Sequence, residues 1–361
     1  IHVVNLHSST NDLCENILIS GSKEAYEGDM SYYADKYNVP IRYVKTLSRE
    51  INIFKDIAAF WQLYRIIRQE KPDIVDTHTS KAGTLGRIAA LLAGVKVRIY
   101  TFHGNIFTGI FGKGKSKIFL LIERFLARFT TKIIAISPKQ KQELIDYKIA
   151  PAEKIAVIKL GYDFAHITPK DTDFGSLKQK YSIPDDACVV SRVCRLAPKN
   201  NVKLFIEIAG LLRDQNIYFF IVGDGEQREL LKDMINNKKL NKVIMTGALN
   251  DVKPVFADSD ILLTTSLTEG TPIAIIEALI NSVIVISTNV GGVADCMDDG
   301  VSGFIINEFD PQMFADKILD IIKGKIDKES IKKNARIKAE TDFSLDRLAK
   351  QTVELYRETV G

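Results

Sequence analysis

The chain has few of the residues that build metal centres, disulfide frameworks or membrane spans. Its 361 residues include four cysteines, none in a Cys-x-x-Cys pair, and five histidines, none in a His-Glu-x-x-His pair. No apolar run approaches the roughly 18 residues of a membrane-spanning helix. No signal peptide is visible. We therefore expect free thiols in a reducing, cytoplasmic compartment and neither a disulfide framework nor a zinc site.

The composition is that of an ordinary globular protein with an uneven charge. Hydrophobic residues make up 46% of the chain and charged residues 26%, and the length predicts about two domains. Residues 1–165 carry 24 Lys and Arg against 16 Asp and Glu, a net +8, which leaves −4 for the remainder of the +4 total. A basic first half indicates an acidic partner for that half.

Short β-branched runs alternate with helical patterns along the whole chain. This alternation predicts an α/β protein whose parallel sheets are covered by helices on both faces. We expect doubly wound domains over residues 1–165 and 166–340, followed by a helical segment at 341–361. The predicted strands are residues 1–5, 16–20, 41–44, 73–78, 97–103, 132–137, 155–160, 188–193, 217–222, 242–246, 260–266, 282–288 and 303–306.

The start of the chain does not fit that pattern. A strand at residues 1–5 would be followed almost at once by the next strand, whereas a parallel pair needs a crossover of about a dozen residues. Our hypothesis is that residues are missing between Asn5 and Leu6.

The most informative stretch is residues 260–303. An apolar run ends at Ser266, and a turn carrying Glu269 and Gly270 follows. Thr271 and Pro272 are typical of a helix start, with a hydroxyl N-cap and then a proline that needs no N–H. The predicted helix is apolar on all sides except at Glu277. A carboxylate among apolar residues needs a hydrogen-bonding partner, and a ligand rich in hydroxyls would supply one.

The spacing of these groups fits a nucleotide-sugar. Backbone N–H groups at a helix start bind phosphate, and Glu277 lies roughly 8 Å further along the helix. The alternative is a surface glutamate plus a glutamate with an internal partner, and spacing alone leaves both readings open.

The stretch resembles the Glu-x7-Glu motif of retaining GT-B glycosyltransferases of carbohydrate-active family four. The matching residues are Glu269, Gly270, Pro272, Glu277, Gly291 and Gly292. The resemblance extends over nearly the whole chain. It implies two Rossmann-like domains facing across a cleft, with a C-terminal helix that crosses back onto the first. It also implies that Glu269 faces the donor sugar and Glu277 the ribose. The chain departs from the family at Asn281, Ser282 and Asp295.

Further candidate residues follow other strands. Arg195 and Lys199 follow a predicted strand, and by resemblance they bind the donor diphosphate, although the family has one more residue between them. A solvated basic loop is the alternative. His103 ends a strand, and by resemblance it lies near the donor sugar; a purely structural histidine is the alternative. Gly223 and Gly247 close tight strand–helix turns, and the resemblance places the nucleotide there.

Two further segments bear on whether the protein binds a metal ion or a membrane. Asp258 and Asp260 form an Asp-x-Asp motif, but at the wrong end of a strand for a metal site. Residues 112–132 hold six basic residues and one acid, with an apolar stripe at helical spacing. This basic amphipathic helix either contacts an anionic membrane or packs its stripe into the core. Nucleic acid is not expected, because no aromatic residues interleave with the basic ones.

The resemblance implies a metal-independent hexosyl- or N-acetylhexosaminyltransferase with no cofactor. The donor would be a nucleotide-sugar, by family habit UDP-linked, and the acceptor a lipid-linked glycan of bacterial surface polysaccharide. The enzyme would be cytoplasmic and peripheral on the inner membrane face. Two alternatives stay open, a sugar-nucleotide epimerase of the same fold and a non-catalytic partner subunit.

Overall fold

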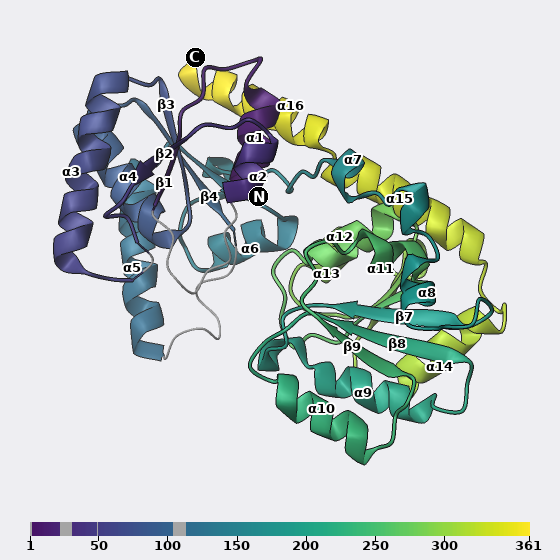
Figure 1. Ribbon diagram of the computed structural model, residues 1–361. Helices are drawn as coiled ribbons and strands as arrows, with labels where there is room; N and C mark the ends of the chain where they lie inside the picture. Colours follow the sequence, from purple (N-terminus) through teal and green to yellow (C-terminus); the bar gives the residue numbers. More distant parts are fainter. Residues whose placement is uncertain (1, 22–30, 49, 104–112) are drawn as a thin grey trace. The chain divides into compact units, whose positions relative to one another are not determined.

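The computed structural model describes residues 2–21, 31–48, 50–103 and 113–361, so the predictions that fall on Ile1, Gly104 and Gly112 lie outside it. The chain divides into two compact units. The first comprises Ile1–Tyr162 with Phe343–Gly361, and the second comprises Asp163–Asp342. Each unit is built of parallel strands that alternate with helices, so the expected α/β architecture is confirmed (Figure 1).

The described part of the first unit holds six parallel strands. β1 (Leu18–Gly21) pairs with β2 (Ile41–Val44), and a four-stranded sheet has the order β3 (Ile74–His78), β4 (Val97–Phe102), β5 (Lys132–Ala135), β6 (Ile155–Val157). Its helices are α1 (His2–Thr10), α2 (Ser31–Lys36), α3 (Ile53–Glu70), α4 (Ser80–Leu92), α5 (Lys113–Phe129), α6 (Pro138–Asp146) and α16 (Leu345–Val360). Figure 1 shows α16, in yellow, beside α1, in purple.

The prediction of a strand at residues 1–5 is wrong. Residues 2–5 belong to α1, a continuous helix through Thr10, so the hypothesis of a missing loop after Asn5 loses its basis. Val3 and Val4 favour a strand locally, but packing decides the conformation. Leu6 is buried against Leu348 and Leu355 of α16. No described helix is long and apolar enough to cross a membrane.

The second unit has one six-stranded parallel sheet of order β12-β11-β10-β7-β8-β9. The strands are β7 (Cys188–Val193), β8 (Ile217–Val222), β9 (Val243–Gly247), β10 (Ile261–Thr264), β11 (Ile284–Thr288) and β12 (Phe304–Ile306). Its helices are α7 (Phe164–Ile167), α8 (Ser176–Lys180), α9 (Val202–Leu211), α10 (Arg228–Asn237), α11 (Lys253–Asp258), α12 (Ile273–Ile280), α13 (Val293–Cys296), α14 (Pro311–Ile322) and α15 (Lys328–Phe343). Both faces of the sheet are covered, α9 and α10 lying opposite α12 and α13 (Figure 1).

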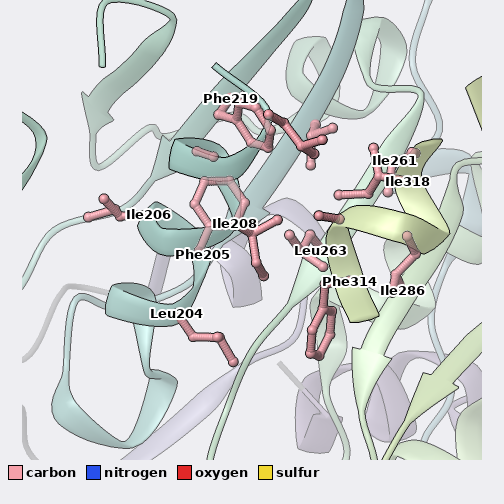
Figure 2. Packing of buried hydrophobic residues seen from close by; sticks show 14 of the residues in the cluster. Leu204, Phe205, Ile206, Ile208, Phe219, Ile261, Leu263, Ile286, Phe314 and Ile318 are labelled. Carbon is pink, nitrogen blue, oxygen red and sulfur yellow. The ribbon is translucent and has the colours of Figure 1, made fainter. Parts of the chain in front are cut away.

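The largest core cluster lies between this sheet and the helices α9 and α14. Phe205 of α9 meets Phe219 of β8 edge to face, with ring centroids 5.7 Å apart. Phe314 of α14 packs in the same cluster beside the strand residues Leu263 and Ile286 (Figure 2). This packed layer holds the strands in place and leaves their carboxyl ends to carry polar loops.

Candidate functional site

The candidate donor site lies where the order of the second sheet reverses. The chain proceeds from β7 to β8 and β9 on one side and returns to β10, β11 and β12 on the other. In open α/β sheets, ligands bind at the carboxyl ends of the two strands flanking such a switch point. These strands are β7 and β10, which pair directly with each other. The loops after them carry Arg195 and Lys199, and Glu269, Gly270 and Thr271.

Arg192 joins these two loops and was missed by the sequence analysis. Its side chain is 1% exposed. One guanidinium nitrogen donates a 2.6 Å hydrogen bond to Ser266 Oγ, in the loop after β10. It donates a second hydrogen bond, of 3.3 Å, to the Asn200 carbonyl in the loop after β7. Its Nε is buried and has no hydrogen-bond partner among the described residues. A single charged residue inside the otherwise uncharged strand β7 was the signal that could have revealed it.

Glu269 is partly exposed and held in place from two sides. Ser266 Oγ donates to Glu269 Oε1 over 2.6 Å. The loop after β11 packs on the backbone of the same turn, because a Cβ at Gly291 would lie 1.7 Å from the Glu269 carbonyl oxygen. Gly292 N–H donates to the Gly270 carbonyl over 2.9 Å. The glycine pair thus lets two loops approach closely and fixes the turn that presents Glu269.

Glu277 lies in the middle of α12 and is half-buried. Burial raises the pKa of its carboxyl to about 7. Its carboxyl group has no hydrogen bond or ion pair with the described residues. The alternative of an internal partner for Glu277 therefore finds no support in the described part of the chain. Its oxygens are available to a ligand.

The predicted start of α12 needs a correction. The helix begins at Ile273, and Pro272 occupies the N-cap position in extended conformation, with φ −76° and ψ 102°. No side chain caps the helix, so Thr271 is not the N-cap. Because no hydroxyl occupies the N-cap position, the backbone N–H groups of this turn remain available to other acceptors.

Arg195 and Lys199 are both exposed in the loop after β7. The Arg195 guanidinium lies 3.3 Å from a Glu226 carboxylate oxygen, in a pair that is mostly solvent-exposed. Such pairs contribute little stability, so a phosphate can replace the carboxylate. The Lys199 carbonyl accepts a 2.8 Å hydrogen bond from Leu267 N–H, which anchors the backbone of the loop. The Lys199 ammonium has no partner among the described residues.

Gly223 and Gly247 shape the neighbouring turns. Gly223 has φ 135°, and a Cβ there would lie 1.9 Å from the Cys194 carbonyl oxygen. Its N–H donates to the Gly247 carbonyl over 2.9 Å, and Gly247 has φ 75°. The close approach at Gly223 excludes any side chain there, and the left-handed φ of Gly247 favours glycine. The two residues therefore support the β7 loop that carries Arg195.

In the first unit, His103 directly follows β4 and meets His78, the last residue of β3. His78 Nδ1 lies 2.8 Å from His103 Nε2. Burial, with a further contribution from His78, lowers the pKa of His103 to about 3. His2, His78 and His103 are the one group in the described part of the chain whose spacing could hold a metal ion. Their separation along the chain explains why the sequence indicated His103 alone and not the group of three.

Two other sequence predictions concern surface and motif residues. The Asp258 carboxylate accepts backbone N–H groups of Gly175, Leu177 and Lys178, and Asp260 accepts that of Val189. Both aspartates therefore serve the backbone. The α5 stripe is exposed, which contradicts the alternative that it packs into the core. Its members are Ile118, Leu121, Ile122, Phe125 and Phe129.

Comparison with known proteins agrees with this fold. The family description "Glycosyl transferases group 1" matches residues 173–338, and "Glycosyltransferase Family 4" matches residues 17–166. The chain is 32% identical over 343 residues to the UDP-Gal:alpha-D-GlcNAc-diphosphoundecaprenol alpha-1,3-galactosyltransferase of Escherichia coli, covering 92% of this chain and 87% of that protein. It is 27% identical to the capsular polysaccharide biosynthesis glycosyltransferase CapM of Staphylococcus aureus, covering 89% and 86%.

Solved structures share the fold over nearly the whole chain. Anabaena Alr3699/HepE in complex with UDP superposes with a TM-score of 0.84 at 21% identity, covering 99% of this chain and 95% of that one. A glycosyltransferase from Rickettsia africae superposes with a TM-score of 0.80 at 23% identity, covering 99% and 94%. The chain therefore belongs to the family-four glycosyltransferases of GT-B fold, and it is an enzyme of that class.

Proposed function

We propose that this glycosyltransferase moves a sugar from a UDP-sugar to a lipid-linked glycan, with retention of the anomeric configuration and without a metal ion. The E. coli relative is named for a UDP-galactose donor and a diphosphoundecaprenol-linked acceptor, and the Anabaena structure holds UDP. The relative from S. aureus is named for capsular polysaccharide biosynthesis.

Glu277 is the observation that carries the proposal. A half-buried carboxyl group without a protein partner is costly to keep, and ribose hydroxyls would donate to it. The diphosphate would lie nearer the start of α12, at the amides of Gly270 and Thr271, since free N–H groups at a helix start bind anions. Glu269 would accept from hydroxyls of the donor sugar.

The charge that develops during transfer falls on the diphosphate. The bond between the anomeric carbon and the β-phosphate oxygen breaks, and its electron pair remains on the departing UDP. A hydroxyl oxygen of the acceptor forms the new bond to the anomeric carbon, and its proton leaves to the departing phosphate or to water. Arg195 and Lys199 would stabilise that charge, because positioned cations act most strongly where charge appears in the transition state. The Lys199 ammonium, which has no partner among the described residues, can reorient toward the phosphate. Contact of His103 with the donor sugar stays a prediction.

A thermal-shift screen tests donor binding. UDP-, GDP- and ADP-sugars would be added in the presence of EDTA to the wild type, to Glu277→Ala and to Glu207→Ala. Glu207 is an exposed carboxylate on α9 and serves as the control. We expect UDP-sugars to raise the melting temperature of the wild type and of Glu207→Ala, with the shift lost in Glu277→Ala. A shift that needs metal, or that survives Glu277→Ala, would contradict the proposal.

Turnover assays separate the two alternative activities. A transferase consumes donor only with acceptor, whereas an epimerase converts donor alone and a non-catalytic subunit converts none. NMR of the product anomeric proton then tests retention. An inverted product would contradict that part of the proposal while leaving donor binding intact.

The exposed face of α5 fits a contact with anionic membrane. Phe125 and Leu121 are 58% and 62% exposed, and the exposed basic residues Lys117 and Arg128 lie on the same helix. An apolar stripe beside basic residues is typical of helices that lie in the membrane interface. This contact would bring the enzyme to a lipid-linked acceptor.

Vesicle sedimentation tests the membrane contact. We expect binding to vesicles with anionic lipid that weakens at high salt and is lost in the double variant Leu121→Ser, Phe125→Ser. Leu211→Ser removes an equally exposed apolar residue from α9 of the second unit and is the control. Equal binding to neutral vesicles, or no binding, would contradict the contact.

A further inference from the structure

Three histidines from separate elements converge in the first unit. His2 is the first residue of α1, His78 the last of β3, and His103 directly follows β4. One ring nitrogen from each lies within 4.8 Å of those from the other two. The ring centroids of His2 and His103 are 5.0 Å apart, and those of His78 and His103 are also 5.0 Å apart.

The rings are suited to act as ligands in their chemical state. Metal ions bind neutral imidazole, so a protonated ring must first lose its proton. His2 Nδ1 is buried without a hydrogen-bond partner among the described residues. In the tautomer that carries its proton on Nε2, this nitrogen presents a lone pair to a metal.

A carboxylate stands behind one of the rings. Asp76 Oδ2 lies 3.7 Å from His78 Nε2, on the opposite side of the ring from the Nδ1 that faces His103. The Tyr356 hydroxyl donates to the same Asp76 oxygen over 2.8 Å. A carboxylate that orients the second nitrogen is common behind metal-binding histidines, and Asp76 lies within ion-pair range of that nitrogen of His78.

The backbone beside His78 is strained. Thr79 has φ 65° and ψ 159° without being glycine, and its side chain makes no cap hydrogen bond to α4. Such conformations are unfavourable for residues other than glycine and cluster at functional sites. His78, which precedes Thr79, faces the rings of His103 and His2.

We propose that His2, His78 and His103 form a binding site for a divalent transition-metal ion such as Zn²⁺. Three histidines and an open fourth position form a known tetrahedral zinc arrangement, with Zn–N distances of about 2.0–2.1 Å. Those distances place ligand nitrogens about 3.3 Å apart. His78 and His103 would therefore separate by about half an ångström from their 2.8 Å contact when the ion enters.

The ion would act as an inhibitor. A bound metal occupies the His103 nitrogen and withdraws it from the donor sugar. This consequence rests on the proposed function of His103, whereas metal binding itself does not. It is also compatible with transfer that needs no metal.

Cobalt absorption tests the site without any donor. Co²⁺ would be titrated into the EDTA-treated, desalted protein and then displaced by Zn²⁺. We expect one equivalent to bind with the absorption of a tetrahedral centre, and binding to weaken at least 100-fold in His2→Ala and in His78→Ala. His166→Ala removes a histidine of α7 that pairs with Asp163 in the second unit, and it should bind as the wild type does.

Two further measurements complete the test. Asp76→Asn should weaken binding by about 10–100-fold while leaving the stoichiometry at one, which a purely structural aspartate would not do. Zn²⁺ should raise KM for the donor in the wild type but not in His78→Ala. Absence of saturable binding, or binding that survives both histidine variants, overturns the metal site. Binding without inhibition retains the site and overturns the role of His103.

Discussion

The Arg192 guanidinium donates a 2.6 Å hydrogen bond to Ser266 Oγ, across the switch point of the second sheet. The same Ser266 hydroxyl donates a 2.6 Å hydrogen bond to the Glu269 carboxylate. A buried cation on β7 thereby orients a carboxylate on the loop after β10.

Removing this buried cation should impair catalysis. We expect Arg192→Met to lower kcat/KM by about 10–100-fold, since hydrogen bonds to charged groups contribute about 1.5–3 kcal/mol. Ser266→Ala should produce a comparable loss. If the three residues act as one chain, the double variant should lose no more than the larger single effect. Steady-state kinetics with folded variants checks this, and fully additive losses would contradict the coupling.

The stability of the second unit should depend on the ionisation of Glu277. Burial raises its carboxyl pKa to about 7 in the folded protein. As the pH rises, Glu277 therefore ionises at a lower pH in the unfolded chain than in the folded protein. The contribution of Glu277 to stability is then complete below about pH 4.5 and decreases as the pH rises through 7. Glu277→Gln should abolish this loss, which amounts to about 1–3 kcal/mol at pH 8.5. Urea unfolding of both proteins at pH 5 and 8.5 measures it, and parallel pH profiles would refute it.

Gly291 should tolerate no side chain. Gly291→Ala would place a Cβ 1.7 Å from the Glu269 carbonyl at φ 56°, so the turn must move. We expect a loss of about 2–4 kcal/mol in stability and a strong loss of activity. Gly300→Ala is the matched control, because it has φ 71° with nothing within 4 Å and should cost only about 1 kcal/mol. Thermal unfolding of both variants separates the cost of the steric clash from the cost of a left-handed backbone at a residue with a side chain. An equal loss of stability in the two variants would contradict the close approach at Gly291.

The buried pair of Arg87 and Glu123 should be essential to the anchoring of α5. The two side chains meet at 2.8 Å, and Arg87 also lies over the Tyr100 ring at 3.8 Å. Glu123→Ala would leave a buried charge without a partner and should destabilise the protein by about 3–5 kcal/mol. Replacing both residues, as Arg87→Met with Glu123→Leu, should recover most of that loss. Chemical denaturation checks both, and a double variant as unstable as the single would contradict the argument.

Much of the fold was predictable from local patterns. The strands at residues 41–44, 188–193 and 217–222 have the bounds that their β-branched runs predicted. Apolar runs such as those at 188–193 and 217–222, between helical patterns, specify buried parallel strands whatever their partners are. The positions of Glu269, Arg195 and His103 at strand ends followed from the same patterns. Their roles at the donor stay predictions.

The failures came from positions where packing overrides local preference. Val3 and Val4 read as a strand, yet the contact of α1 with α16 makes the segment helical. The stripe on α5 fitted a buried face equally well, and its exposure in the fold contradicts that reading, whereas membrane contact stays a prediction.

The sequence by itself determined the class of fold and the strand ends at which candidate site residues lie, because both depend on short-range periodicity. Only the tertiary structure decided which of these residues meet. Arg192 and Ser266 are 74 residues apart in the chain, and His78 and His103 are 25 apart. Their contacts arise from strand order and register, which neighbouring residues do not encode.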